Sequence, residues 1–460
     1  MPLSIIILAA GQGKRMRSAL PKVLHPMAHK PLLAHVYAVA SEFAGADIHV
    51  VYGHGGEQVP SALSELDVTW TEQAEQLGTG HAVAQALLKV PDEQTVLILY
   101  GDIPLIRFAT LESLITTGES SGFGLLTAEL PVPTGYGRIV RTADGEIERI
   151  VEETDASPTE LALKEVNTGM MAVAAKRLRD WLARIDDNNA QNEYYLTDVV
   201  ELAIADGVSV GTVGPEVVQE VMGINDRVQL AALERYYQLQ QATALMRAGA
   251  TIVDPARIDI RGEVSVGHDV FIDVNVVLEG TVNIGEGVRI GPNNVIRNAE
   301  IGDYTTLLPN CVVDDAIIGA GGRIGPFARI RPDTRLSPGV HIGNFVEIKK
   351  SDVGTDSKVN HLAYVGDSEI GRDVNVGAGT ITCNYDGAFK HRTVIGDDAF
   401  IGSDVQLVAP VTVGAGATIG AGTTIVEDVP PGKLTVGRTQ QRTIDDWIRP
   451  GKTPKKNREN

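Results

Sequence analysis

A glycine-rich turn with basic neighbours follows the first apolar run of the chain. Gly11 and Gly13 would let the backbone approach a phosphate group, and three cationic side chains lie in the turn or soon after it: Lys14, Arg15 and Lys22. The turn is not a P-loop, because no Ser or Thr follows a Gly-Lys pair at the required spacing, and Met16 stands where a dinucleotide fingerprint needs its third glycine. Taken alone, it predicts either a phosphate site or only a tight turn.

A second group of polar residues interrupts an apolar repeat in the C-terminal half. It combines imidazole, amide and hydroxyl side chains: Asn360, His361, Tyr364, Asn375, Thr380, Asn384 and Tyr385. Acylation of an amine needs a base that accepts its proton and donors for the tetrahedral oxyanion. His361 is the candidate base. The alternative is a histidine that only hydrogen-bonds a backbone carbonyl of the repeat.

The N-terminal half alternates between apolar β-rich runs and helical segments. Ser4–Leu8, Ile48–Tyr52 and Thr95–Tyr100 are predicted to be buried strands. His35–Glu42 and His81–Leu88 are predicted to be helices between them. This alternation is typical of a Rossmann-like α/β domain, in which helices cover both faces of a parallel sheet and ligands bind at the C-terminal strand ends.

From about residue 250 onward, branched aliphatic residues recur at every sixth position. Three unbroken series begin at Ile258, Ile318 and Ile395, and a glycine often follows the aliphatic residue. Short strands with inward aliphatic side chains and glycine corners predict a parallel β-helix of hexapeptide type. With three hexads in each coil, this region would form roughly ten coils, stacked over about 48 Å at the ~4.8 Å strand spacing.

The six-residue register breaks between Val376 and Ile395. We therefore predict that Thr382–Arg392 is a loop that leaves the coil, and such loops often carry binding function. The repeat of about 18 residues for each coil also places Arg331 and Lys349 on neighbouring coils. Their side chains are either a phosphate clamp or two solvated charges.

A helical pattern joins the two halves, with Leu230, Leu233 and Tyr237 on one face. Asn225 or Asp226 would cap its start, and Gly249 would stop it. The sequence thus predicts an α/β domain, a helical linker and a β-helix domain with a short basic tail: residues 1–227, 228–248 and 249–460.

Composition and charge exclude several classes of protein. Of 460 residues, 43% are hydrophobic and 22% charged, which is typical of globular domains and excludes wholesale disorder. The acid excess is 59 − 40 = 19, so neither a nucleic-acid nor a membrane partner is expected. Two cysteines, Cys311 and Cys383, exclude a disulfide framework and fit a reducing compartment. Ile5–Ala10 is too short to span a membrane and no basic stretch precedes it, so a cytoplasmic protein is expected.

Several motifs together resemble the signature of sugar-nucleotide pyrophosphorylases. They are Leu8–Met16, Leu20–Lys22, Gln73–Gly80, Tyr100–Asp102, Thr134–Arg138, Val166–Gly169 and Gly223–Asn225. With hexapeptide repeats behind them, the chain resembles the bacterial bifunctional family that combines N-acetylglucosamine-1-phosphate uridylyltransferase and glucosamine-1-phosphate N-acetyltransferase. Lys14 departs from the pattern, since many members carry Thr there, but an added cation keeps a phosphate role intact.

The resemblance implies a substrate site for UTP and N-acetylglucosamine-1-phosphate in the N-terminal domain. The implied substrate contacts are Leu8, Ala9, Ala10, Gly11, Lys22, Gln73, Gly78, Thr79, Tyr100, Gly101, Asp102, Gly137, Glu152, Asn167 and Asn225. Arg15 and Lys22 would be the catalytic cations at the triphosphate. Among the implied contacts, Gln73, Gly78 and Thr79 would bind the uracil base. The sugar would be bound by Gly137, Glu152 and Asn167.

The resemblance also implies Mg²⁺ bound by Asp102 and Asn225. Mg²⁺ takes few protein oxygens and keeps waters and substrate phosphates as its other ligands, and Asp102 follows a predicted strand. Each implied role has a plainer alternative: a turn residue for Asp102, a helix cap for Asn225, and a solvated carboxylate for Glu152.

For the β-helix, the resemblance implies that His361 is the base of acetyl transfer. The implied contacts of glucosamine-1-phosphate are Arg331, Lys349, Tyr364 and Asn375, and those of acetyl-CoA are Ala378, Asn384, Tyr385, Ser403, Ala421 and Arg438. The family forms homotrimers with acetyl sites between subunits, and its β-helix is left-handed. Cys383 is interpreted as a small, partly buried thiol, because direct transfer from acetyl-CoA needs no second thioester.

The expected function is therefore bifunctional. The β-helix would acetylate glucosamine-1-phosphate, and the N-terminal domain would join the product to UTP with release of pyrophosphate, supplying UDP-N-acetylglucosamine for peptidoglycan and outer-membrane lipid synthesis. One rival is a nucleotidyltransferase whose β-helix only oligomerises or binds a regulator, and another is a non-catalytic assembly subunit. The presence of Asp102, Asn225 and His361 argues against both rivals.

Overall fold

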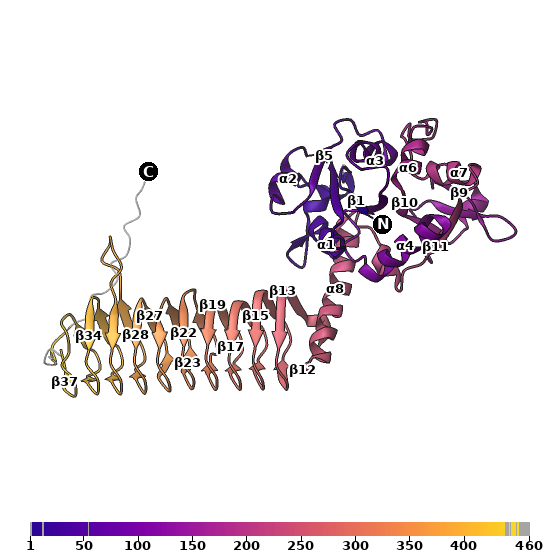
Figure 1. Ribbon diagram of the computed structural model, residues 1–460. Coiled ribbons are helices and arrows are strands. Elements are labelled where there is room, and N and C mark those ends of the chain that lie inside the picture. The colour runs from indigo at the N-terminus through magenta and orange to yellow at the C-terminus, as the bar shows by residue number, and fades with distance from the viewer. Residues whose placement is uncertain are drawn as a thin grey trace, which may run out of the picture. The chain divides into compact units, whose positions relative to one another are not determined.

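The computed structural model describes residues 2–11, 13–53, 55–437, 441, 443–447 and 449. Its contacts divide the chain into two units, Met1–Ala244 with Asp259–Gly262, and Leu245–Ile258 with Glu263–Asn460 (Figure 1). The predicted boundaries at residues 227 and 248 stay a prediction about which segments fold and act alone. Within the described part of the chain, no helix has both the length and the apolar character that a membrane crossing needs.

The first unit is built on a nine-stranded sheet with the order β11-β7-β10-β6-β1-β4-β5, to which the β8–β9 hairpin adds. Its strands are β1 Leu3–Leu8, β4 Asp47–Tyr52, β5 Thr69–Glu72, β6 Thr95–Tyr100, β7 Gly122–Glu129, β8 Arg138–Arg141, β9 Ile147–Val151, β10 Glu165–Ala174 and β11 Ser209–Val213. The short pair β2 Pro26–Met27 and β3 Lys30–Pro31 lies outside this sheet. The three predicted strands are thus confirmed as β1, β4 and β6.

The sheet is mixed, whereas the sequence predicted a parallel one. β1 pairs in parallel with β4 and β6, but β10 runs antiparallel to both β6 and β7. The reason is the connection between β7 and β10, which contains the β8–β9 hairpin and one short helix rather than a long crossover helix. The C-terminal ends of β1 and β6 still meet at one edge, because those two strands are parallel neighbours.

Helices cover both faces of this sheet. Side chains of β1 alternate between two hydrophobic clusters, with Ile5 and Ile7 in one and Ile6 and Leu8 in the other. The helices are α1 Leu32–Ala40, α2 Gln58–Ala62, α3 Thr79–Leu87, α4 Phe108–Ser121, α5 Pro158–Leu161, α6 Ala175–Leu182 and α7 Asp198–Ala205, with 3₁₀ turns at Lys14–Met16, Lys22–Leu24 and Val218–Val221. The predicted helices are confirmed as α1 and α3, which begin two to three residues earlier than expected.

Helix α8, Arg227–Arg247, continues the first unit through Ala244. Asp226 caps it, because its Oδ1 accepts hydrogen bonds from the backbone N–H groups of Val228 and Gln229 at 2.9 and 2.8 Å. Leu233 is 2% exposed and packs in a small cluster with Met27, Leu32 and Ile224. The cap leaves the Asn225 side chain free for another role.

The second unit is a parallel β-helix, as predicted. One of its sheets has eleven strands: β12 Ala250–Ile252, β14 Val270–Ile272, β16 Arg289–Ile290, β18 Thr306–Leu307, β20 Arg323–Ile324, β23 His341–Asn344, β26 Lys358–His361, β29 Asn375–Val376, β32 Phe400–Ile401, β35 Thr418–Ile419 and β37 Leu434–Thr435. A 3₁₀ turn at Pro255–Arg257 precedes the first long strand. Eleven strands on one face agree with the expected ten or so coils, while the left-handed sense stays a prediction.

The other two faces of the coil form one fifteen-stranded sheet, because long strands turn a corner in the first coils. These long strands are β13 Ile258–Val266, β15 Val276–Ile284, β17 Val295–Ile301 and β19 Val312–Ile318. One face continues as β21 Arg329–Ile330, β24 Glu347–Lys349, β27 Tyr364–Gly366, β30 Ile381–Cys383, β33 Gln406–Val408 and β36 Thr424–Ile425. The other continues as β22 Thr334–Leu336, β25 Asp352–Val353, β28 Ser368–Ile370, β31 Thr393–Ile395 and β34 Val411–Val413.

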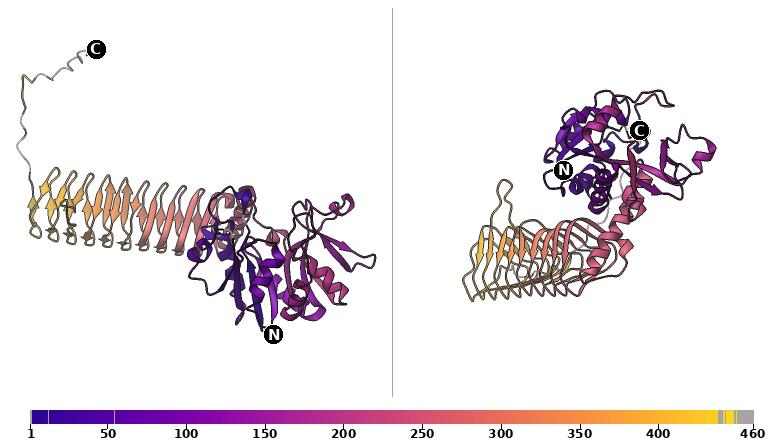
Figure 2. Two further views of the ribbon diagram at one scale, coloured as in Figure 1. Left: turned by 90° about the horizontal axis from the view of Figure 1, so that it is seen from above. Right: turned by 45° about the vertical axis from the view of Figure 1, so that its right-hand side comes forward.

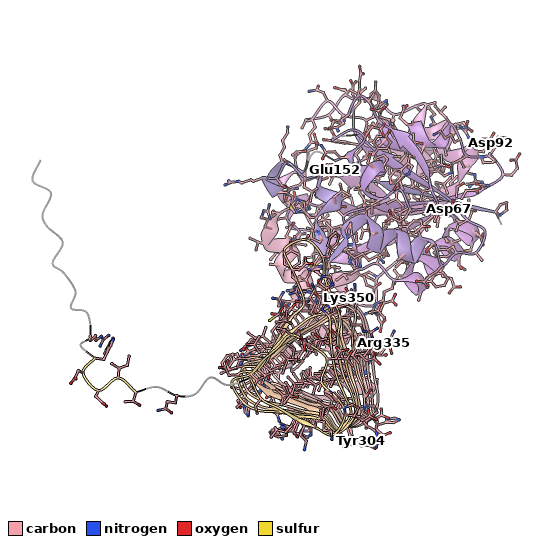
Figure 3. All side chains as sticks on the ribbon, turned by 90° about the vertical axis from the view of Figure 1, so that its left-hand side faces the viewer. Asp67, Asp92, Glu152, Tyr304, Arg335 and Lys350 are labelled. Atoms are coloured by element: carbon pink, nitrogen blue, oxygen red, sulfur yellow. The ribbon has the colours of Figure 1, made fainter. Side chains whose placement is uncertain are left out.

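The coils stack in one straight row (Figure 2) and enclose a triangular cross-section, with Tyr304, Arg335 and Lys350 on the outside (Figure 3). Every aliphatic residue of the three hexad series is buried except Val264, which is half-buried. Val264 lies on β13, which pairs only with β15 among the strands that the structure describes.

A loop leaves the coil between β30 and β31 and rises above the stack in the yellow-orange region of Figure 1. It begins at Asn384 rather than at the predicted Thr382, which is buried in β30 and accepts a hydrogen bond from the N–H of Gly366 at 2.8 Å. Asp386 orders the loop, because its carboxylate accepts from the N–H groups of Ala388 and Phe389 and pairs with His391. These bonds lower the pKa of Asp386.

Candidate active sites

A cavity of about 700 Å³ opens at the C-terminal ends of β1 and β6. Predicted residues that line it are Leu8, Ala9, Ala10, Gly11, Arg15, Lys22, Gln73, Gly78, Thr79, Tyr100, Asp102 and Asn225. Gly101 lies beneath this surface, where its N–H donates to the carbonyl of Leu8 at 2.9 Å. The location follows from topology, since parallel neighbours end at the same edge and leave a crevice there.

Three polar side chains converge inside this cavity. The ammonium group of Lys22 forms an ion pair with Oδ2 of Asp102 and donates to Oδ1 of Asn225 at 3.1 Å. The N–H of Ile224 donates to the carbonyl of Asp102 at 2.9 Å, which fastens the segment before α8 to the end of β6. The side-chain oxygens of Asp102 and Asn225 thus face the same point, which the Lys22 ammonium group occupies.

Glutamines shape the opposite wall of the cavity. Nε2 of Gln73, which is 3% exposed, donates to the carbonyl of Gly78 at 3.0 Å. This bond fixes the orientation of the Gln73 amide, with Oε1 pointing away from the carbonyl of Gly78. Gln76 donates from Nε2 to the carbonyl of Ala10 at 3.0 Å, so it ties the glycine-rich turn to the wall.

The predicted sugar contacts form a cluster beside the cavity. A Cβ on Gly137 would lie 3.3 Å from Oε1 of Glu152, and the N–H of Asn167 donates to the carbonyl of Gly137 at 2.9 Å. Thr197 donates to Oε1 of Glu152 at 3.1 Å. Burial raises the pKa of Glu152, and the hydrogen bond from Thr197 opposes that shift. Glu152 is therefore a half-buried carboxylate whose position is fixed by the hydrogen bond from Thr197, and not a solvated one.

On the β-helix, five residues stack in one line at the corner between the eleven-stranded sheet and the face that carries β27. In each step the residue after one member donates its N–H to the carbonyl of the preceding member: Leu362 to Asn344, Gly379 to His361, Asp404 to Ala378, and Gly422 to Ser403. We call Asn344, His361, Ala378, Ser403 and Ala421 the corner column. It places Ala378 on the coil next to the predicted base, and Ser403 and Ala421 on the two coils after that.

His361 is exposed, and the partner of its ring is a side chain. Nδ1 lies 3.0 Å from Oδ1 of Asn344. The alternative, a histidine that satisfies a backbone carbonyl inside the coil, does not describe this geometry. Cys383 is half-buried, and its nearest polar contact is the carbonyl of Ile381 at 4.0 Å.

A cationic cluster lies at the far end of the face that carries β27. Arg331 and Lys349 occupy neighbouring coils, as predicted, since the N–H of Arg331 donates to the carbonyl of Ile348. Arg331 also donates to Glu347 at 2.7 Å. Lys390, from the protruding loop, lies against Lys349, and the pKa of Lys390 is lowered by a hydrogen bond with Lys349 and by the like charge of its ammonium group. Two ammonium groups held this close favour an anion between them.

Two family models match the chain. One, described as a MobA-like NTP transferase domain, covers residues 5–195, and one described as bacterial transferase hexapeptide (six repeats) covers residues 392–427. The bifunctional protein GlmU of Methylococcus capsulatus is 56% identical over 456 residues, which is 99% of each chain. Those of Aromatoleum aromaticum and Marinobacter nauticus are 57% and 53% identical, and the matches cover 98% of this chain and 99% of each relative. The chain belongs to the family of bifunctional GlmU proteins.

As a GlmU family member, the chain brings together most of the residues predicted for each site, but not all. Tyr364 and Asn384 meet, because a Cβ on Gly366 would lie 2.5 Å from the Tyr364 hydroxyl and 2.8 Å from Nδ2 of Asn384. Tyr385 is exposed in the loop that follows. Asn375, however, belongs to β29 in the eleven-stranded sheet, on a different face from Tyr364. Arg438 lies outside the described residues.

Sequence reasoning missed several residues that the structure places at the sites. They are Gln76, Gln191 and Glu193 at the cavity, Thr197 and Asp198 beside Glu152, and Asn344, Glu347 and Lys390 on the β-helix. Burial, with Glu152 nearby, raises the pKa of Asp198 to about 6. Four of them carried a sequence signal: Gln76 lies within a pyrophosphorylase-like motif, Lys390 lies within the predicted loop, and Asn344 and Glu347 lie within Ile342–Glu347, a stretch that also resembles the bifunctional family.

Gly169 tests how tightly the cavity floor is built. Its φ is +84°, and a Cβ there would lie 2.5 Å from the ring of Tyr100. Gly145 has nearly the same φ, +87°, but a Cβ on it would meet no atom within 4 Å. Both substitutions by alanine carry a backbone cost of about 1–2 kcal/mol, and Gly169→Ala adds a steric cost of about 1–3 kcal/mol.

We therefore expect Gly169→Ala to lower the unfolding temperature of the first unit more than Gly145→Ala does. Calorimetry on both variants measures the difference. Equal shifts would mean that the Tyr100 ring moves aside without cost.

Proposed function

We propose that this chain catalyses two consecutive reactions. The β-helix transfers the acetyl group of acetyl-CoA to glucosamine-1-phosphate, and the first unit transfers UMP from UTP to the resulting N-acetylglucosamine-1-phosphate. The products of the second step are UDP-N-acetylglucosamine and pyrophosphate. Membership of the bifunctional GlmU family over 98–99% of the chain supports both halves of the proposal.

The observation that carries the first-unit reaction is the convergence of Lys22, Asp102 and Asn225 in a cavity of nucleotide size. The sugar phosphate brings its own anionic nucleophile, so the enzyme needs only to align it with the α-phosphate and to stabilise the charge that spreads over the transferred group. Lys22 and Arg15 supply that positive charge. The glycine-rich turn supplies room for the phosphates, and Oε1 of Gln73 is available to the uracil edge.

Asp102 and Asn225 suit Mg²⁺ as a cofactor. Their oxygens already share one cation, the Lys22 ammonium, so they converge as metal ligands must. Among the described residues no cluster of three His, Cys, Asp or Glu side chains could hold a metal. That fits an ion whose other ligands are waters and substrate phosphates. Bound there, Mg²⁺ would neutralise charge on the triphosphate.

The corner column supports acetyl transfer on the β-helix. The amine of glucosamine-1-phosphate attacks the thioester carbonyl, and His361 takes up the proton that the attacking nitrogen loses. The C–S bond then breaks, and the CoA thiolate leaves and is protonated. Ala378, Ser403 and Ala421 are small and lie on the coils beyond His361, so a thioester donor can lie along them. Arg331, Lys349 and Lys390 offer charges for the sugar phosphate.

A homotrimer would complete the acetyl site. Asn375 and Tyr364 lie on different faces of one coil, so one subunit does not unite them around one substrate. Exposed rings support a subunit contact, because Phe327 and Phe345 stack on neighbouring coils at 5.3 Å between centroids while 50% and 56% exposed. Sedimentation or light scattering on the full chain measures the expected trimer.

A single incubation tests the proposed function. The full chain receives glucosamine-1-phosphate, acetyl-CoA, UTP and Mg²⁺ together, and free thiol, pyrophosphate and sugar nucleotides are measured. We expect UDP-N-acetylglucosamine with one thiol released for each product molecule. Pyrophosphate formation from N-acetylglucosamine-1-phosphate without any thiol release from the amine substrate would favour a nucleotidyltransferase with a non-catalytic β-helix.

The division of the chain leads to a further prediction. Residues 1–227 alone should form UDP-N-acetylglucosamine from N-acetylglucosamine-1-phosphate but remain monomeric. They should melt at a lower temperature than residues 1–247, because they lack Leu233, whose burial contributes about 1.5–3 kcal/mol. A trimeric fragment, or a folded fragment without uridylyl transfer, would contradict these boundaries.

A further inference from the structure

Asn344 and His361 are direct partners on adjacent strands. They are paired residues in the parallel ladder between β23 and β26, and the carbonyl of Asn344 also accepts from the N–H of Leu362 at 3.1 Å. Paired positions of neighbouring strands carry their side chains on the same side of the sheet. The backbone ladder thus fixes the separation of the two side chains before any hydrogen bond forms between them.

The chemistry of the amide decides which nitrogen of His361 carries a proton. Oδ1 of Asn344 can only accept, so Nδ1, 3.0 Å away, must be the protonated nitrogen of the neutral ring. Nε2 then keeps its lone pair and is the nitrogen that can take a proton from a substrate. A ring free to flip or to exchange tautomers would present a usable base for only part of the time.

The nearby carboxylate of Glu347 is engaged elsewhere. Its Oε1 accepts from Arg331 at 2.7 Å, and its Oε2 lies 3.8 Å from Arg329. An amide partner also differs from a carboxylate in charge, because it orients the ring without adding a negative charge that would favour the imidazolium form. The arrangement therefore suits a base that has to be neutral at the start of the reaction.

We infer that Asn344 is a positioning residue for acetyl transfer, which holds His361 in the Nδ1-protonated form and aims Nε2 at the substrate amine. This inference rests on the proposed acetyltransferase function. Asn344 acts through His361 and contributes no proton of its own. Its removal should therefore affect turnover more than substrate binding.

The experiment compares three full-length variants with the wild type: Asn344→Ala, Asn344→Asp and Asn283→Ala. Asp keeps an acceptor oxygen at the same place. Asn283 is the matched control, because it is another asparagine on a β-helix strand, and its Oδ1 accepts from the neighbouring coil, in this case from Ser265 at 2.6 Å. Each variant is assayed for kcat and KM of acetyl transfer and for melting temperature.

We expect Asn344→Ala to lower kcat about tenfold, below the 10²–10⁴-fold contribution of a positioned base as a whole. KM for glucosamine-1-phosphate should change less than about twofold, since the cations at Arg331 and Lys349 remain. Asn344→Asp should recover part of the lost kcat, because it restores the acceptor oxygen but adds a negative charge that favours the imidazolium form. Asn283→Ala should match Asn344→Ala in melting temperature and the wild type in kcat.

The tautomer supplies a readout that needs no activity. Long-range ¹⁵N–¹H spectra of histidine-labelled protein distinguish a protonated Nδ1 from a protonated Nε2, and His361→Ala assigns the signal. We expect the Nδ1-protonated pattern in the wild type and a mixture in Asn344→Ala. An active wild type with unchanged kcat and tautomer in Asn344→Ala overturns this inference alone, whereas a wild type that transfers no acetyl group removes the proposed function itself. A loss of kcat that follows melting temperature and is not recovered by Asp would assign Asn344 a structural role only.

Discussion

Asp102→Ala is expected to abolish uridylyl transfer and to leave acetyl transfer near the wild-type rate. The carboxylate of Asp102 is 14% exposed and is paired with the Lys22 ammonium at the point where the nucleotide phosphates would lie. Its removal takes away the charged oxygen that suits Mg²⁺ and frees Lys22 from its position. The His361 site belongs to the other unit and has its own set of contacts.

Both activities are measured on the same preparation, as pyrophosphate release from UTP and thiol release from acetyl-CoA. Asp67→Ala is the matched control, since Asp67 is an exposed acidic residue of the same unit (Figure 3) and should leave both activities unchanged. Asp102→Asn keeps the oxygen but not the charge and should fall between the wild type and alanine. Equal loss of both activities in a folded Asp102→Ala protein would remove the assignment of Asp102 to the first reaction.

His361→Ala should reduce acetyl transfer by about 10²–10⁴-fold, the usual contribution of a positioned general base. KM should change less, because Arg331 and Lys349, the proposed contacts of the sugar phosphate, remain in place. Uridylyl transfer should not change. Because His361 is exposed and fills no part of the core, the melting temperature should stay close to that of the wild type.

Two controls accompany this variant. His341→Ala removes a half-buried histidine from β23 of the same sheet and should keep its turnover. Cys383→Ala should cost far less than His361→Ala unless the thiol carries the acetyl group. Melting temperature and single-turnover acetylation are measured on the same samples. A large loss of stability with nearly normal turnover for each folded molecule would make His361 a structural residue.

The β-helix was predictable from the sequence because its signal is local and repeated. Each hexad places an aliphatic side chain inward, and every coil repeats the same requirement, so an irregular residue at one position does not obscure the pattern. The strands β1, β4 and β6 were predictable for a similar reason, since a short apolar run between turns has few alternatives. The positions of the glycine-rich turn around Gly11 and of Asp102 were predictable as well, because they come directly after β1 and β6.

The helix cap shows where local reasoning stopped. Asn225 and Asp226 are both good N-cap residues, and the sequence could not choose between them. The fold chose Asp226, because Ile224 is fastened to Asp102 and this directs Asn225 into the cavity toward Lys22. That choice depends on contacts between segments more than a hundred residues apart.

Contacts between segments far apart in the sequence also decide three other features of the structure. They are the antiparallel placement of β10, the approach of Lys390 to Lys349 and the separation of Asn375 from Tyr364. The sequence by itself determined the two kinds of fold, and it identified the glycine-rich turn as a candidate phosphate site and His361 as the candidate base. Only the tertiary structure decided which side chains face one another, as with Asn344 and His361, whose pairing appears once the register between β23 and β26 is known. Periodicity reports burial residue by residue, whereas a contact depends on how strands are registered and loops are folded across the chain.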